Sequence, residues 1–212
     1  SQSHPGSTAK LMTLPTTSQL TVPPAAFQSI VQTHTGTMSM PPLICSCGKP
    51  LDKHGHHAMV CKRTRGRFSR HDRIVQCLKR CMKGAGMVAC AEMRIVRHSS
   101  KRMDIILYDG TRVTWYDVSV VHPAAATYRS AASKEAGAAS TARAAQKITK
   151  YGTYAEEEKV NFKPLIFETS GRFDDETKKL LITIAHHKAN STAHQLTAAA
   201  IRRLAAKEYR YM

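Results

Sequence analysis

The sequence predicts an α/β fold in which helices flank a mixed β-sheet. The prediction rests on four segments with strand character, on an alanine-rich helical segment at 127–150, and on Asp109-Gly110, a strong signal for a tight hairpin. The four strand segments are 87–96, 103–108, 112–121 and 162–168. Strands that alternate with helices in this order indicate a sheet covered by helices.

The helices outside this strand region are marked by their first residues. The first helix should begin near Ser69 and end at Gly84. Ser69 and Asp72, three residues apart, together resemble a capping box. Asp174 and Ser191 are candidate N-caps of two later helices, the second of them a basic C-terminal helix over 189–212.

Residues 1–42 are rich in Ser, Thr, Pro and Gln, contain no acidic residue and show no apolar period. This composition predicts a disordered, flexible arm or linker. A mitochondrial presequence is the alternative, although such segments are typically rich in arginine and the first arginine of this chain is Arg63.

The chain has 212 residues, with 32 Lys and Arg against 15 Asp and Glu, and a formal charge of +17. This length fits one main domain with a small accessory module. Self-repulsion on this scale is tolerated when an anionic partner neutralises it, so DNA or structured RNA is the expected partner. No long apolar run and no basic amphipathic helix points to a membrane.

A compact group of Cys and His residues precedes the predicted sheet. Four potential ligands lie within 17 residues, namely Cys45, Cys47, His57 and Cys61. Four is the number that a closed, structural zinc site needs. His54 and His56 are competing ligands, and three unlinked thiols beside surface histidines are the alternative. The concentration of ligands favours the interpretation that residues 43–65 form a zinc knuckle.

Two aspartates are expected to meet on one face of the hairpin. With Asp109-Gly110 as a two-residue turn, Asp104 lies opposite Trp115, and Asp117 is its diagonal neighbour on the same face. Two such carboxylates repel each other unless a cation lies between them. Magnesium or manganese can bind this pair, activate water and stabilise charge on a phosphodiester. The alternative is simple pairing of the aspartates with basic residues such as Arg102.

Phosphodiester cleavage also benefits from a cation near the metal. The convenient position on the third strand holds Ser119, so we expect Lys134 on the following helix to supply the charge, with Lys147 as a less favoured substitute. An exposed charge is the alternative for each lysine. His71 and Glu92 are further candidates for contact with the metal or the phosphate, and a buried core histidine is the alternative for His71.

Several short motifs occur in a fixed order along the chain. They are Cys45-x-Cys47-Gly48, Gly55-His56-His57-Ala58, Cys61, Arg70-His71, Arg102-Met103-Asp104, Asp117-Val118 and the alanine-rich helix with Lys134. From about residue 43 to about residue 185, this set resembles the C-terminal zinc knuckle and restriction-like endonuclease of site-specific non-LTR retrotransposons. The resemblance implies a PD-(D/E)XK-type, restriction-endonuclease-like domain over 66–188 that nicks target DNA, leaving a 3′ end that primes reverse transcription.

The resemblance also assigns roles to residues. It implies that the four Cys/His ligands hold zinc, that Asp104 and Asp117 hold magnesium or manganese, and that Lys134 is a catalytic lysine displaced to the helix. This family often moves that lysine off the strand, which accounts for Ser119. Met103 stands where the family usually has proline, which leaves open a domesticated copy that binds without cutting. A reverse transcriptase would belong to other domains of a longer polyprotein.

The function expected from these observations is metal-dependent nicking of DNA. The alternative is a non-catalytic module that binds nucleic acid or stabilises a ribonucleoprotein. Both functions use basic side chains that contact phosphates without reading sequence. The candidates are Lys62, Arg63, Arg65, Arg67, Arg70, Arg73, Arg102, Arg202 and Arg203. The expected compartment is the nucleus, with the mitochondrion as the alternative.

Overall fold

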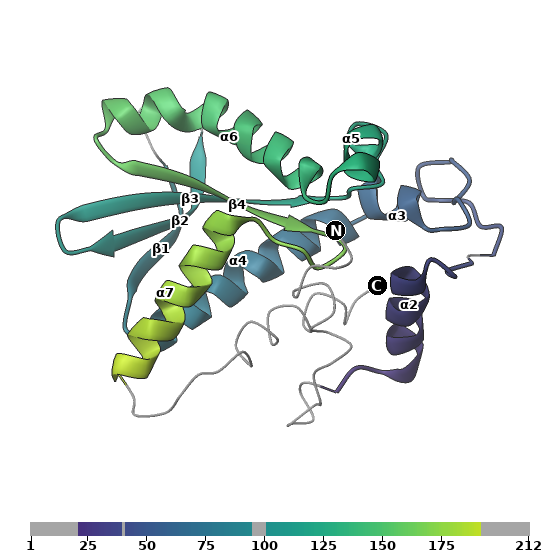
Figure 1. The fold of residues 1–212 in the computed structure, drawn as a ribbon, viewed down its shortest axis with the longest axis horizontal. Coiled ribbons are helices and arrows are strands. Elements are labelled where there is room, and N and C mark those ends of the chain that lie inside the picture. The colour runs from purple at the N-terminus through teal and green to yellow at the C-terminus, as the bar shows by residue number, and fades with distance from the viewer. Residues whose placement is uncertain (1–20, 40, 95–100, 192–212) are drawn as a thin grey trace.

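The computed structural model describes residues 21–39, 41–94 and 101–191 (Figure 1). Within these residues a four-stranded sheet has the order β1-β2-β3-β4. The strands β1 (Val88–Arg94), β2 (Arg102–Asp109) and β3 (Arg112–Val121) are antiparallel neighbours, and β4 (Asn161–Glu168) runs parallel to β3. The predicted mixed sheet is confirmed, and its strands lie where the sequence predicts them.

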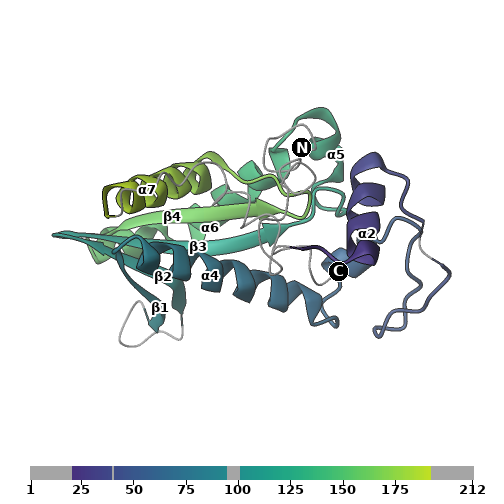
Figure 2. The same cartoon turned by 90° about the horizontal axis from the view of Figure 1, so that it is seen from below.

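Helices cover both faces of this sheet (Figures 1 and 2). The helices α4 (Gly66–Gly84) and α7 (Asp175–Ser191) pack against one face, and α6 (Ala138–Glu157) packs against the other. Successive strand residues point to opposite faces. On β2, Ile105 accordingly belongs to the core on the sheet face that α4 covers, whereas Ile106 belongs to the core on the face that α6 covers. The predicted α/β fold with flanking helices is therefore confirmed.

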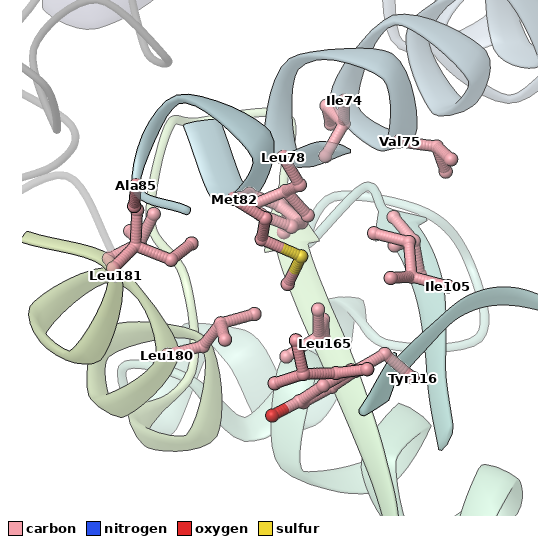
Figure 3. Packing of buried hydrophobic residues seen from close by; sticks show 14 residues of the cluster. Ile74, Val75, Leu78, Met82, Ala85, Ile105, Tyr116, Leu165, Leu180 and Leu181 are labelled. Atoms are coloured by element: carbon pink, nitrogen blue, oxygen red, sulfur yellow. The ribbon is translucent and has the colours of Figure 1, made fainter. Parts of the chain in front are cut away.

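The larger part of the core lies between α4, α7 and the sheet (Figure 3). Leu78 and Met82 of α4 are fully buried and pack with Leu165 of β4 and Leu180 of α7. Leu78 and Met82 share a face because residues four apart in a helix lie one above the other. Burial of each such side chain contributes about 1.5–3 kcal/mol.

Two helix boundaries differ from the prediction. The helix α4 begins at Gly66, so Ser69 and Asp72 lie inside it and do not form a capping box. The single helix expected at 127–150 is divided into α5 (Arg129–Lys134) and α6. Gly137 separates them at a φ of 93°, where a Cβ would come within 2.7 Å of the Arg172 guanidinium.

The hairpin turn lies one residue later than predicted. Asp109 pairs with Arg112, so the turn residues are Gly110 and Thr111. The register consequently shifts by two residues, and Ile106 rather than Asp104 lies opposite Trp115. The predicted position of both aspartates on one face is also wrong, because pairing of β2 with β3 ends at Ile105 and Tyr116. Beyond that pair, Asp104 contacts His71 on the α4 side, whereas Asp117 contacts Lys147 on the α6 side.

The N-terminal and C-terminal segments also differ in part from the prediction. The helix α2 (Pro24–Thr35) occupies part of the predicted flexible arm and buries Ile30. The predicted cap at Asp174 is confirmed, because its Oδ1 accepts the backbone N–H of Thr177 at 3.0 Å. The helix α7 includes Ser191, so this residue is the last described residue of a helix and not the predicted N-cap of the next one. The remainder of the arm (1–20) and of the basic C-terminal segment lies outside the described residues.

No helix in the described ranges combines the length and the apolar character that a bilayer crossing requires.

Candidate functional site

The four predicted zinc ligands come together in space. Their ligand atoms all lie within 4.8 Å of one another, and the four residues could hold a metal ion such as zinc. Sγ of Cys45 lies 3.6 Å from Sγ of Cys61, and Sγ of Cys47 lies 3.2 Å from Nε2 of His57. A tetrahedral ion with Zn–S bonds of about 2.3 Å separates two thiolates by roughly 3.8 Å, close to the first distance.

One carboxylate fixes the loop that presents His57. The backbone N–H groups of His54, His56 and His57 donate to Asp52 at 3.1, 3.0 and 2.6 Å. Burial works against ionisation of Asp52, but these backbone hydrogen bonds hold its pKa below the usual value. The sequence prediction missed Asp52. Its signal is an aspartate just ahead of a short helix, α3 (His56–Val60).

The competing histidines, His54 and His56, are not members of the metal group. His56 Nδ1 lies 3.0 Å from Nε2 of His122 at the end of β3, and His122 Nδ1 lies 2.6 Å from Oγ1 of Thr169. Burial lowers the pKa of His122 to about 4 and also lowers the pKa of His56. A pair of neutral imidazoles therefore joins the knuckle to the sheet.

A second group of charged side chains lines a cavity of 280 Å³ between α4, β2, β3 and α6. We call it the acid cavity. Its charged lining consists of Arg67, His71, Arg102, Asp104, Asp117, Arg143 and Lys147. The structure thus brings the two predicted aspartates into one cavity surrounded by cationic groups.

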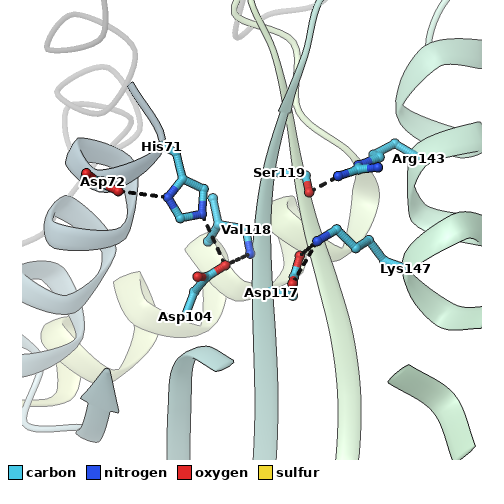
Figure 4. A network of polar contacts seen from close by, with 8 residues as sticks. All are labelled: His71, Asp72, Asp104, Asp117, Val118, Ser119, Arg143 and Lys147. Carbon is cyan, nitrogen blue, oxygen red and sulfur yellow. Dashed lines mark hydrogen bonds and ion pairs between the residues drawn. The ribbon is translucent and has the colours of Figure 1, made fainter. Parts of the chain in front are cut away.

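Asp104 is held from two directions (Figure 4). Its Oδ2 accepts the backbone N–H of Val118 at 2.7 Å and lies 3.3 Å from Nε2 of His71. The other ring nitrogen of His71 lies 3.1 Å from Asp72. The hydrogen bond to Asp104, with a smaller contribution from Asp72, raises the pKa of His71 to about 9. His71 is therefore a cation at neutral pH and neutralises Asp104.

Asp117 lies on the α6 side of β3 and is only 4% exposed. Nζ of Lys147 donates to its Oδ1 at 2.9 Å and lies 2.6 Å from its Oδ2. Burial raises the pKa of Asp117, while the charge of Lys147 opposes that shift and the charge of Asp104 adds to it. Oδ2 of Asp117 is buried, and its contact with the Lys147 ammonium is an ion pair.

The lysine in this cavity is not the one favoured by the sequence. Lys134, the last residue of α5, is exposed and does not line the acid cavity. Lys147 enters from α6 instead. Arg143, four residues earlier on the same helix, lines the cavity and donates through Nε to Ser119 at 3.3 Å. The sequence prediction missed Arg143, which its spacing of one helical turn from Lys147 could have indicated.

Other predicted site residues have separate positions. Glu92 belongs to β1, and its side chain lies outside the part of the chain that the structure describes. Arg67 and Arg102 line the acid cavity, whereas Arg65 and Arg73 line a neighbouring one.

The other residues predicted to bind phosphate lie in three different environments. Lys62 and Arg63 are exposed just after Cys61, the last of the four predicted zinc ligands. Arg70 donates through Nη2 to the carbonyl of Met59 at 2.6 Å, so it joins α4 to α3. Arg202 and Arg203 lie outside the described residues.

Comparison with models of known protein families gives no match, and comparison with curated proteins gives no significant match. The geometry of the two sites and the motifs in the sequence are therefore the features that bear on function.

Proposed function

We propose that the chain is a divalent-metal-dependent endonuclease of the restriction-like, PD-(D/E)XK type, which nicks DNA as part of a non-LTR retrotransposon protein. The observation that carries the proposal is the convergence of Asp104, Asp117 and Lys147 on the acid cavity. A mixed sheet between helices is compatible with the fold that the motif resemblance implies. The formal charge of +17 favours binding to the phosphate backbone.

The carboxylates of the acid cavity suit magnesium or manganese. The carboxylates of Asp104 and Asp117 line the same cavity, and Oδ2 of Asp117 is a buried oxygen whose close contact in the described residues is the Lys147 ammonium at 2.6 Å. Hard divalent ions prefer carboxylate oxygens and complete their shells with water and substrate phosphate. When bound, such an ion supplies an activated water and stabilises charge on the phosphodiester.

The neighbouring side chains have positioning and electrostatic roles in this proposal. His71 and the backbone N–H of Val118 orient the carboxylate of Asp104. Lys147 holds the carboxylate of Asp117, and its ammonium group lies in the cavity where negative charge on the phosphate would increase. Arg143 lies beside it and is suited to contact a phosphate oxygen.

The test is nicking of supercoiled plasmid by the full chain in magnesium or manganese. We expect Asp104→Asn and Asp117→Asn each to abolish nicking while DNA binding is retained, because amides keep the shape of the side chains but lose the charge that holds the metal. Asp109→Asn is the matched control, since Asp109 is an exposed carboxylate at the hairpin turn. If the wild-type chain binds DNA but nicks with neither metal, the nuclease proposal fails and the non-catalytic binding module is favoured.

A further inference from the structure

A second charged groove lies along the outward side of α4. It is a cavity of 410 Å³ lined by Arg65, Phe68, Ser69, Asp72, Arg73, Gln76 and Arg80, and we call it the α4 groove. Phe68 lines both the α4 groove and the acid cavity. The two cavities therefore adjoin, and the ring of Phe68 forms the ridge between them.

The ridge is unusual because a large aromatic side chain is left in solvent. Phe68 is 60% exposed, although phenylalanine is among the residues most often buried. The Arg67 guanidinium lies 5.9 Å from the centre of its ring. An exposed ring beside a guanidinium is the arrangement on which an unpaired base stacks. In the interior of a duplex, by contrast, both faces of each base are already stacked on neighbouring base pairs.

The charges of the α4 groove suit a phosphate backbone. Among the described residues that line it are three arginines, Arg65, Arg73 and Arg80, and one carboxylate, that of Asp72, which contacts His71. The Nε of Arg80 donates to the carbonyl of Gln76 at 3.3 Å, which orients its guanidinium along the helix. From Phe68 to Arg80 the helix rises about 18 Å, enough for roughly five phosphates of a stacked strand.

We infer that the Phe68 ridge and the α4 groove bind a single-stranded stretch of nucleic acid, with one unpaired base stacked on Phe68 and the phosphates along the arginines. The strand then continues from the ridge into the acid cavity. This last step deepens the proposed function and rests on it, because it places a phosphodiester beside Asp104 and Asp117. The substrate class is therefore DNA with an unpaired segment next to the cut.

The test measures binding of the full chain to a fluorescent single-stranded oligonucleotide and to a blunt duplex of the same sequence. Buffers contain no magnesium, manganese or chelator, so cutting is prevented and bound zinc is retained. We expect Phe68→Ala to weaken single-strand binding roughly 5- to 150-fold, which corresponds to the loss of one stacked base, and to change duplex binding little. Phe68→Trp should restore single-strand binding.

Two matched controls accompany these variants. Phe27→Ala removes a similarly exposed ring from α2, outside both cavities, and should leave both affinities unchanged. Arg80→Gln should reduce the salt dependence of single-strand binding by about 0.7 in the slope of log affinity against log salt, whereas Arg112→Gln, at the exposed hairpin, should not.

The inference is overturned if Phe68→Ala leaves single-strand binding unchanged, or if it weakens single-strand and duplex binding equally. Failure of the proposed function gives a different pattern. A chain that never nicks plasmid but loses single-strand binding in Phe68→Ala keeps the binding site and loses the nuclease assignment.

Discussion

Lys147 of α6 spans from the helix to β3, so that its Nζ lies 2.9 Å from Oδ1 and 2.6 Å from Oδ2 of Asp117. This contact distinguishes between the two lysines, Lys134 and Lys147, that the sequence predicts as candidates for the catalytic cation. Lys147 is buried in the acid cavity, whereas Lys134 is exposed outside it.

The first prediction compares these two lysines. Lys147→Met should abolish nicking, because the cavity loses its buried ammonium group, and Lys134→Met should leave nicking close to the wild-type rate. The measurement is the rate of plasmid nicking in manganese, with DNA binding followed in parallel. If only Lys134→Met lost nicking, Lys134 would be the catalytic lysine, as the sequence predicts.

The second prediction concerns stability in the same ion pair. Lys147→Met leaves the buried carboxylate of Asp117 without its partner, which should lower the free energy of unfolding by about 3–5 kcal/mol at neutral pH. Burial already raises the pKa of Asp117, and loss of the opposing charge raises it further. When the pH is below the unfolded-state pKa, a carboxyl group with a raised folded-state pKa is protonated and does not destabilise the fold. Its ionisation destabilises the fold as pH rises through the folded-state pKa.

The deficit of Lys147→Met should therefore be small in acid and grow toward neutral pH. Urea unfolding at several pH values measures it. In Asp117→Asn/Lys147→Met no carboxyl group titrates at this position, so that variant should lack the dependence. A deficit that is equal at all pH values in Lys147→Met would contradict the assignment to Asp117.

Much of the fold could be predicted because periodic patterns report burial. The third strand segment matches β3 at both ends, since its β-branched and aromatic residues and the turn signal before it are local properties. The carboxylates were predicted to share a site, and both line the acid cavity although the turn was misplaced. Their predicted position on one face of the sheet was wrong, because Asp104 contacts α4 through His71 and Asp117 contacts α6 through Lys147.

The cation of the site could not be predicted from local pattern. Lys134 and Lys147 both lie in an alanine-rich helical segment, and the break at Gly137 decides which part of it packs on the sheet. At this break the Arg172 guanidinium, from a distant part of the chain, lies where a Cβ on residue 137 would stand. In the same way, the pairing of His56 with His122 joins residues too far apart in sequence for spacing to indicate it.

The third prediction concerns His71 and Asp104. The hydrogen bond to Asp104 raises the folded-state pKa of His71 to about 9, above an unfolded value of about 6.5. Its contribution to stability is therefore complete below about pH 6.5 and is lost as pH rises through about 9. His71→Asn should lack this loss. Urea unfolding at pH 6 and pH 9, without divalent ions, compares the two proteins, and parallel losses would contradict the assignment.

The fourth prediction concerns the knuckle. The chain should bind one zinc ion, and Cys61→Ser should lose it, because Cys61 belongs to the four-residue group. Cys90→Ser is the matched control, since Cys90 is exposed on β1 and outside the group. Zinc released by a thiol-reactive reagent and counted with a colorimetric chelator gives the stoichiometry. Equal zinc content in both variants would exclude Cys61 as a ligand.

The last prediction tests Asp52, which contacts the knuckle backbone without being one of the four ligands. Its carboxylate accepts three backbone N–H groups, including that of His57 at 2.6 Å, and so fixes the position from which the His57 ring reaches Cys47. Groups that orient a metal ligand typically change metal affinity by about 10- to 100-fold. Asp52→Ala should therefore weaken zinc binding by that factor.

Competition with a chelator of known affinity measures this change, and Asp109→Ala serves as the matched control because it removes an exposed carboxylate far from the knuckle in sequence. Asp52→Asn separates geometry from charge, because an amide oxygen can still accept backbone hydrogen bonds. Substantial retention of affinity in Asp52→Asn, with a large loss in Asp52→Ala, would show that Asp52 acts by holding the loop. Equal losses in both variants would assign its effect to the negative charge near the ion.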